Sequence, residues 1–153
     1  MTQLFEIPAP LRAEHDALHT TLAAATREPG LLGETAREVA RLLHPHFVRE
    51  EDFAMPPLAL LGALARGTVT PDMARVLPMT RRLRDELPAM LAEHQQIVAA
   101  LEKMRSAASA ADRADYVRFA DALTLHAQTE ELVLYPAAIL VGDKVAAALD
   151  IAP

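Results

Sequence analysis

A polar motif occurs twice in this chain, and it limits the possible folds more than any other feature. Each copy has a histidine, two glutamates that begin four residues later, and a proline: His46, Glu50, Glu51 and Pro56, then His126, Glu130, Glu131 and Pro136. The same interval separates all four pairs. The tripeptide Ala-Glu-His, which ends at His15 and again at His94, recurs at an interval one residue shorter. Two similar helical hairpins related by a pseudo-two-fold axis explain this repeat better than chance does.

The rest of the sequence is typical of helices. Hydrophobic residues make up 52% of the 153 residues, only 5 are glycine, and no segment alternates polar and apolar residues as a strand would. The 11 prolines divide the chain. They predict long helices at about 9–27, 33–54, 79–107 and 112–134, and short ones at about 57–65 and 137–148. We expect one all-α domain over 1–153, a four-helix bundle with its third helix kinked or restarted at Pro88 and its fourth ended by Pro136.

The repeated polar side chains fall on the sides of these helices that should be buried. At about 100° per residue, every long helix places a histidine on its apolar face, and two helices add a glutamate one turn later. These residues are His15, His46, Glu50, His94, His126 and Glu130. A buried, unpaired carboxylate takes up a proton, whereas a metal ion would satisfy imidazoles and carboxylates that converge from facing helices. The alternative is a set of isolated core histidines held by hydrogen bonds.

The ordered set His15, His46-x-x-x-Glu50, His94 and His126-x-x-x-Glu130 resembles the hemerythrin-like (HHE cation-binding) domains over about residues 9–136. The resemblance implies an antiparallel up-down bundle around a di-iron centre, with two iron ions joined by an oxo or hydroxo bridge. It assigns metal ligation to these six residues, with the carboxylates bridging and the histidines capping, and it assigns no catalytic residue. Sites of imidazole and carboxylate also accept other divalent ions, so the metal stays open.

Two further histidines lie near the motif. His19 follows His15 by one turn, and it is a candidate for a fifth histidine ligand or for a residue packed beside the ligands. In oxygen-carrying hemerythrins the additional histidine is on the third helix, where this chain has Val98. His44 should point to the surface, because it lies about 160° around the helix from the ligand stripe.

Two interpretations are open for the other polar residues near the motif. Glu14 and Glu93 could each accept the free ring N–H of a ligating histidine on a neighbouring helix, or lie on a solvated face. Glu51 and Glu131 should lie off the ligand face, as surface charges or as partners of the ligands. Tyr135 should lie half a turn from the ligand stripe of its helix, so it receives no role.

The composition excludes several classes of function. A formal net charge of −6 argues against non-specific binding of nucleic acid. The absence of cysteine excludes a disulfide scaffold, a cysteine-ligated iron–sulfur cluster and a thiol nucleophile. Proline, glycine or charge interrupts every apolar stretch before about 18 residues, so no membrane span is expected. The first residues do not resemble a signal peptide, which makes a cytoplasmic location the expectation.

The resulting hypothesis is a non-haem di-iron protein that binds or senses oxygen or nitric oxide, or that handles iron. Two alternatives stay open. One is a di-iron redox enzyme that reduces peroxide or nitric oxide, and the other is a module that a divalent ion holds together without redox chemistry. The expected partner is a small diatomic ligand, and the oligomeric state is not determined.

Overall fold

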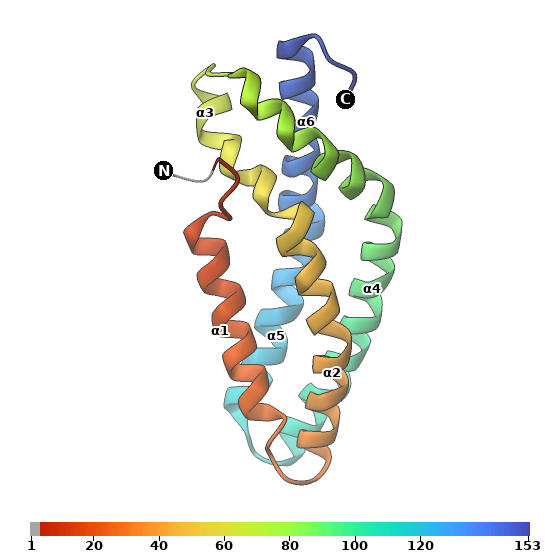
Figure 1. The fold of residues 1–153 in the computed structure, drawn as a ribbon. Coiled ribbons are helices and arrows are strands. Elements are labelled where there is room, and N and C mark those ends of the chain that lie inside the picture. The colour runs from red at the N-terminus through yellow and green to blue at the C-terminus, as the bar shows by residue number, and fades with distance from the viewer. Residues whose placement is uncertain (1–3) are drawn as a thin grey trace.

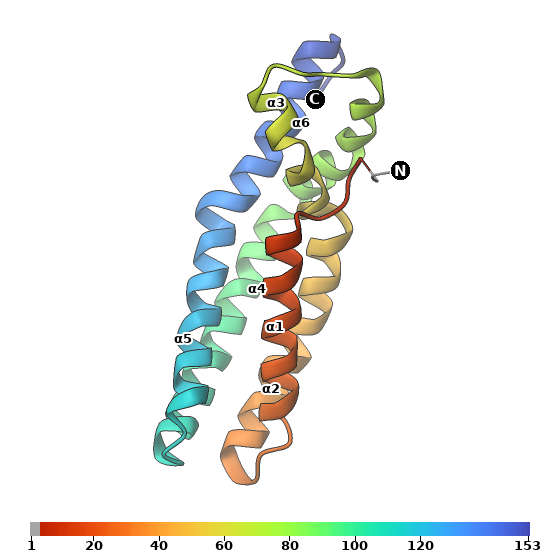
Figure 2. The same cartoon turned by 90° about the vertical axis from the view of Figure 1, so that its left-hand side faces the viewer.

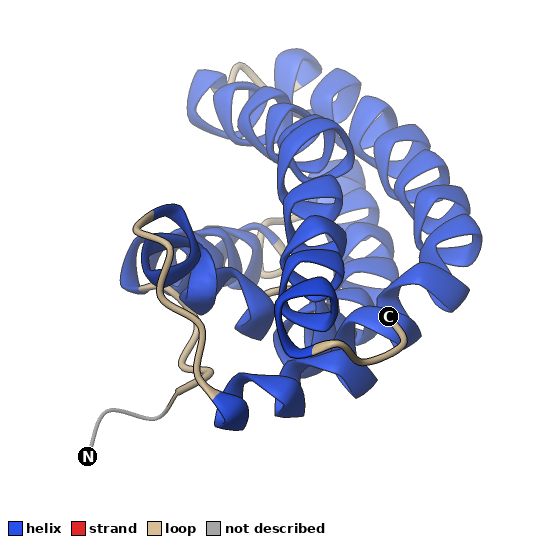
Figure 3. Cartoon of the chain, turned by 90° about the horizontal axis from the view of Figure 1, so that it is seen from above, coloured by secondary structure: helices blue, strands red, loops and turns tan. Residues whose placement is uncertain are grey.

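The computed structural model describes residues 4–153, which are largely helical and contain no strand (Figure 3). The four long helices are α1 (Ala9–Ala25), α2 (Gly30–Arg49), α4 (Leu77–Ala110) and α5 (Ala114–Thr129). Figure 1 shows the α1–α2 turn and the α4–α5 turn at the same end of the bundle, so neighbouring helices run antiparallel. The predicted all-α four-helix bundle is confirmed.

The helices pack through their apolar faces. α2 packs against α4, α4 against α5, and α1 against both α2 and α5. At the end with the two turns, the core includes Leu22, Val39, Leu43, Leu101 and Phe119, all buried. Burying a side chain of this size stabilises the fold by about 1.5–3 kcal/mol. Apolar packing therefore contributes to the stability of the bundle whether or not a metal is bound.

A second apolar cluster fills the bundle further from the turns, with Phe53, Leu83 and Met90 among its members. A third lies beyond it, under the short helices of the middle segment. The predicted ligands fall between the first two clusters, because their sequence neighbours on one side belong to the first and those on the other side to the second. The polar layer is thus enclosed by apolar side chains above and below.

The second and fourth bundle helices each change to a π-helical turn at the glutamate of the repeated motif. The turns are η1 (Glu50–Ala54) and η4 (Glu130–Leu134), which occupy equivalent positions in the two copies. In η1 the N–H of Met55 donates to the carbonyl oxygen of Glu50, five residues back, at a distance of 2.8 Å. A π turn holds one residue more than an α turn, so it rotates the side chains after it.

The two turns lead to different continuations. After η1 the chain leaves the bundle as a 3-10 helix, η2 (Pro56–Leu60), because two consecutive prolines remove two backbone donors. After η4 it continues directly into α6 (Tyr135–Leu149), with the single Pro136 near the start of that helix (Figure 2). The prediction that Pro136 ends the fourth helix is therefore wrong. The wider π turn accommodates the proline instead.

The joined helix Ala114–Leu149 has 36 residues, and an 18-residue window within it reaches a mean hydropathy of 1.7. By length and composition alone it could cross a membrane, because Pro136 does not interrupt this helix. Core helices of other proteins pass the same test. Here the helix supplies His126 and Glu130 to the buried polar layer.

The middle segment connects the two hairpins. It contains η2, α3 (Leu61–Ala65) and η3 (Pro71–Val76) before α4 begins. α4 is one continuous helix of 34 residues with Pro88 inside it, and it is longer than the predicted 79–107. The ribbon of α4 changes direction in Figure 1, and an internal proline gives this bend a physical cause, since it removes one backbone hydrogen bond.

Candidate metal centre

The six predicted ligands meet in one layer of the bundle. The histidines come from the four long helices, and the two glutamates are the first residues of the two π turns. Every one of the six is at most 4% exposed: His15, His46, Glu50, His94, His126 and Glu130. Their predicted burial is confirmed. Six ionisable side chains enclosed in this way require partners.

The ligand atoms form two groups. In one, atoms of His46, Glu50, His94 and Glu130 all lie within 4.8 Å of one another. In the other, atoms of His15, His126 and Glu130 do so. We call these the His46–His94 group and the His15–His126 group. Each group has two imidazoles and at least one carboxylate, and Glu130 belongs to both.

Glu130 is placed between the groups, with one oxygen toward each. Its Oε2 lies 3.2 Å from Nε2 of His94, in the first group. Its Oε1 lies 2.8 Å from Nε2 of His126 and 3.5 Å from Nε2 of His15, in the second. A carboxylate divided in this way is suited to bridging two cations.

The two oxygens of Glu50 are likewise directed toward different groups. Its Oε1 lies 3.2 Å from Nε2 of His46, and its Oε2 lies 3.7 Å from Nε2 of His15. The two carboxylates thus span the two groups side by side. The geometry fits two adjacent cations that share both glutamates.

Unsatisfied polar atoms test whether this layer fits a metal. Among residues 4–153, four buried side-chain atoms have no hydrogen-bond partner: His15 Nε2, Glu50 Oε2, His126 Nε2 and Glu130 Oε1. Nε2 of His126 and Oε1 of Glu130 are only 2.8 Å apart, but not in hydrogen-bond geometry. All four atoms face the His15–His126 group. A buried polar atom without a partner costs about 1–3 kcal/mol, and a bound cation would satisfy all four at once.

The outer nitrogen of each imidazole faces a second carboxylate. The Nδ1–carboxylate distances are 3.1 Å for His15–Glu51, 2.7 Å for His46–Glu93, 3.0 Å for His94–Glu131 and 3.1 Å for His126–Glu14. An Nδ1–H that donates outward leaves the Nε2 lone pair directed toward the centre, as metal ligation requires. The interpretation of Glu14 and Glu93 as partners of histidines on neighbouring helices is confirmed, and Glu51 and Glu131 have the same function within their own halves.

A comparison with known protein families agrees with this geometry. The family model "Hemerythrin HHE cation binding domain" matches residues 7–138 of the chain. The chain belongs to the hemerythrin HHE cation-binding family. Comparisons with curated proteins and with solved structures give no match. Family and buried cluster together identify a metal-binding domain.

In the metal-free hemerythrin HHE domain, the pKa values of the buried residues indicate which of them carry protons. Burial lowers the pKa of His126, but the Glu130 carboxylate raises it more, to about 9. Burial raises the pKa of Glu130, yet the imidazoles around it hold that pKa well below the usual value. Burial and the neighbouring Glu130 raise the pKa of Glu50. The protons on His126 and Glu50 occupy positions that a metal ion would take, so metal binding should release protons.

Tyr135 is a residue of the hemerythrin HHE centre that the sequence analysis missed. Its side chain is 1% exposed, and its hydroxyl oxygen lies 3.3 Å from Nε2 of His46 and 3.2 Å from Nε2 of His94. The hydroxyl donates a hydrogen bond to Oε1 of Glu50. Burial and the carboxylates of Glu50 and Glu130 raise the pKa of the phenol far above its usual value.

The prediction that Tyr135 lies half a turn from the ligand stripe is wrong because of the π turn η4. That turn takes up one additional residue, which rotates the following side chains by about 100° relative to a continuous α-helix. Tyr135 therefore faces the centre, whereas Val133, which a continuous α-helix would place on the same face as His126, is 55% exposed. The proline that follows each copy of the motif was the available signal for an irregular turn.

His19 is not brought to the centre by this fold. It is half-buried, and its ring packs edge-on against Phe47 with a centroid distance of 5.0 Å. The same Phe47 ring stacks on His15 at 3.9 Å. None of the converging ligand atoms belongs to His19. His44 is exposed, as expected, and its ring lies 6.0 Å from that of His19.

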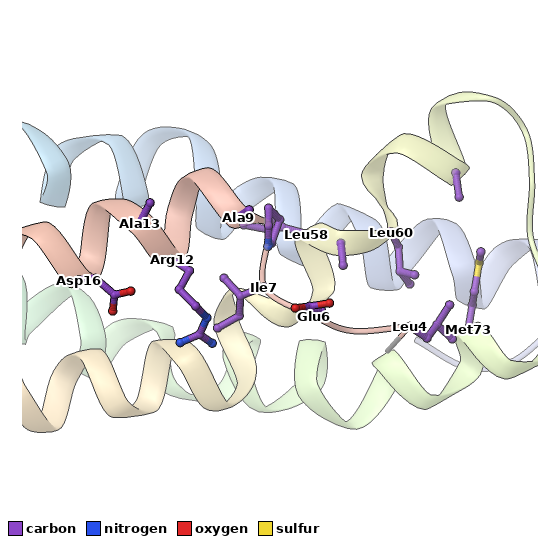
Figure 4. Close-up of a pocket in the computed structure, with 13 residues that line it drawn as sticks. Leu4, Glu6, Ile7, Ala9, Arg12, Ala13, Asp16, Leu58, Leu60 and Met73 are labelled. Atoms are coloured by element: carbon purple, nitrogen blue, oxygen red, sulfur yellow. The ribbon is translucent and has the colours of Figure 1, made fainter. Parts of the chain in front are cut away.

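A cavity of about 850 Å³ opens beside the start of α1 and is distinct from the metal centre (Figure 4). Ile7, Leu58 and Met73 contribute to its lining, and none of the six predicted ligands does. Arg12 connects the two regions, because its guanidinium lies 3.7 Å from Glu51, the carboxylate that faces His15. A smaller pocket of about 340 Å³, lined by residues of α4, α5 and η4, includes His94 in its lining.

Proposed function

We propose that this domain holds two iron ions between His15, His46, Glu50, His94, His126 and Glu130, and that it binds oxygen or nitric oxide there. One observation carries the proposal: Glu50 and Glu130 each direct one oxygen toward each of the two histidine groups. Four buried polar atoms in this arrangement have no hydrogen-bond partner. Imidazole and carboxylate donors suit iron, and a bundle core with such donors is a common setting for di-iron carboxylate sites.

The charge of the layer supports two cations rather than one. Six carboxylates lie in or around it: Glu14, Glu50, Glu51, Glu93, Glu130 and Glu131. Two arginines offset part of this charge, Arg12 beside Glu51 and Arg49 beside Glu93. The remaining negative charge would help to offset the charge of two divalent ions.

When bound, an iron pair supplies one-electron redox chemistry and coordination positions open to small ligands. The protein supplies the remaining requirements. Glu50 and Glu130 fix the spacing, and the outer carboxylates fix the ring orientation of the histidines. Phe47, stacked on His15, and the apolar clusters on either side shield the layer from solvent. A small neutral ligand enters such a layer more easily than a large or charged one.

Anaerobic reconstitution with ferrous iron tests the proposal. We expect two irons per chain by metal analysis. After oxidation we expect an absorption band of an oxo-bridged ferric pair that changes on addition of azide or nitric oxide. The variant His44→Ala is the matched control, since its side chain is exposed and should leave the count at two.

The outcomes separate the alternatives. Catalytic turnover of peroxide or nitric oxide by the loaded protein would favour the redox enzyme. Binding of zinc but not of iron would favour the module without redox chemistry. A count of one iron or none at saturating concentration would contradict the two-metal centre itself.

A further inference from the structure

We propose that Tyr135 is a direct ligand of the metal ion held by the His46–His94 group, so that the two metal positions differ in chemistry. This inference rests on the proposed two-metal function and extends it. It assigns a phenolate donor to one ion and an exchangeable position to the other.

The positions of three donor atoms carry the inference. The hydroxyl oxygen of Tyr135 lies 3.3 Å from Nε2 of His46 and 3.2 Å from Nε2 of His94, and the two nitrogens are 2.8 Å apart. Three donors on one face of an octahedron, each about 2.1 Å from the metal, lie about 3 Å from one another. The three atoms therefore have the separations of donors to a single ion.

The hydrogen bonds around these three atoms leave a position for a cation between them. Nδ1 of His46 faces Glu93 and Nδ1 of His94 faces Glu131, so each ring directs its lone pair at Nε2 inward. Two lone pairs then face each other at 2.8 Å beside the phenol oxygen. The single phenol proton is donated to Glu50, so without a metal only a proton shared between the two nitrogens can hold them together. A metal ion between the three atoms would replace that proton and bind all three donors.

The other half of the repeat lacks an equivalent donor. The residue that precedes the proline of the first copy, as Tyr135 precedes that of the second, is Met55. It is equally buried but carries a thioether, a soft donor poorly matched to iron beside carboxylates. Among residues 4–153, the four polar atoms without partners all face the His15–His126 group. One ion thus has five protein donors and the other has four, so the position open to an external ligand lies beside His15 and His126.

Ligation by Tyr135 would exchange the phenol proton for a metal ion. The phenol O–H bond breaks, an oxygen–metal bond forms, and the proton is released to solvent. No electrons are transferred in this step. A phenolate bound to ferric iron gives a visible charge-transfer band, and light absorbed in that band enhances the ring vibrations of the tyrosine in the Raman spectrum.

The experiment compares the full chain with two single variants after loading with ferrous iron and oxidation by ferricyanide. Tyr135→Phe removes only the hydroxyl, and Tyr116→Phe is the matched control because Tyr116, also buried, hydrogen-bonds Glu28 at 3.4 Å and lies outside the centre. We expect the band and the enhanced vibrations in the wild-type protein and in Tyr116→Phe, and neither in Tyr135→Phe. The iron reduction potential should rise in Tyr135→Phe, since an anionic donor that stabilises the ferric state is lost.

A second measurement covers the case in which Tyr135→Phe does not fold. The chain has two tyrosines, so Tyr135 is the sole tyrosine of Tyr116→Phe. Ring-deuterated tyrosine incorporated into that variant should shift the enhanced vibrations, and this would assign them to Tyr135.

The results distinguish this inference from the proposed function. Wild-type protein that holds two irons but shows no phenolate band would overturn the ligation by Tyr135 and leave the di-iron proposal intact, as would an unchanged spectrum in Tyr135→Phe. Wild-type protein that does not take up two irons would contradict the proposed function, and the inference would fail with it.

Discussion

The two halves of the bundle match closely in the residues that face the metal centre and differ in what lies next to them. Each half supplies two inward histidines, one divided glutamate, one π turn and two outer carboxylates, in the same order along the chain. Yet Tyr135 contacts the His46–His94 group, whereas its counterpart in the repeat is Met55. The His15–His126 group retains the unpaired atoms.

The difference shows that one residue is enough to make a symmetric donor set asymmetric. The backbone of both halves forms the same π turn, so the symmetry of the scaffold is preserved. If two ions bind as proposed, the side chain that the turn directs inward would decide which ion has more protein donors. A centre of this kind can bind an external ligand at one defined ion.

The strongest test of the symmetry is removal of each shared carboxylate. We expect Glu50→Ala and Glu130→Ala each to abolish the two-metal centre, because the remaining anionic donors cannot offset two adjacent cations. Metal analysis at saturating iron measures the effect. Two irons in both variants would refute the bridging function, and loss in only one variant would show that the halves are not equivalent.

Removal of the metal should destabilise the fold without unfolding it. A metal present at about 1,000 times its dissociation constant stabilises the native state by about 4 kcal/mol, and the apolar clusters remain when it is gone. Thermal melts with and without a chelator give the difference. Identical melting curves for the iron-free protein and the protein loaded with two irons would contradict binding in the buried layer.

The stability of the metal-free protein should change with pH in the opposite direction to the stability of the iron-loaded protein. The pKa of His126 is raised to about 9, so the stability it contributes is present below about pH 6.5 and is lost as the pH rises through about 9. The loss is about 3 kcal/mol. In the loaded protein, protons compete with the metal, so stability should increase over the same range. Urea titrations at several pH values measure both trends, and a metal-free protein that gains stability above pH 7 would contradict the raised pKa.

The outer carboxylates should have smaller effects that differ between the halves. Glu93 lies 2.7 Å from His46 and also pairs with Arg49, whereas Glu14 lies 3.1 Å from His126 and is more exposed. We expect Glu93→Gln to weaken iron binding by about 10–100-fold and Glu14→Gln by less. Competition with a chelator of known affinity measures both. A larger loss in Glu14→Gln would reverse the predicted order.

The smallest effect is expected at His19. Its ring lies outside the converging ligand atoms, so His19→Ala should keep two irons per chain with a change in affinity of only a few-fold. Spectra of the oxidised variant and of wild type should agree. A lost iron, or a new open position revealed by altered azide binding, would instead identify His19 as a ligand in solution.

The sequence alone was sufficient for the helical class and for the six residues that converge. Both depend on helical periodicity, which is a local property: a histidine and a glutamate four residues apart lie on one face wherever the helix packs. The repeat then indicated that two such faces meet. The outer partners Glu14 and Glu93 could be anticipated in the same way, because each precedes one of the inward-facing histidines.

Only the tertiary structure decided the path of the chain after the two glutamates. The π turns, the continuation of α5 past Pro136 and the inward position of Tyr135 all depend on how the backbone hydrogen bonds shift by one residue. Such a shift is not visible in the apolar pattern, because it is selected by the packing of the turn against neighbouring helices. The same is true of the exclusion of His19, whose ring lies beside Phe47 rather than at the centre. Local periodicity determined which side chains face inward on regular helix, and long-range packing determined the rest.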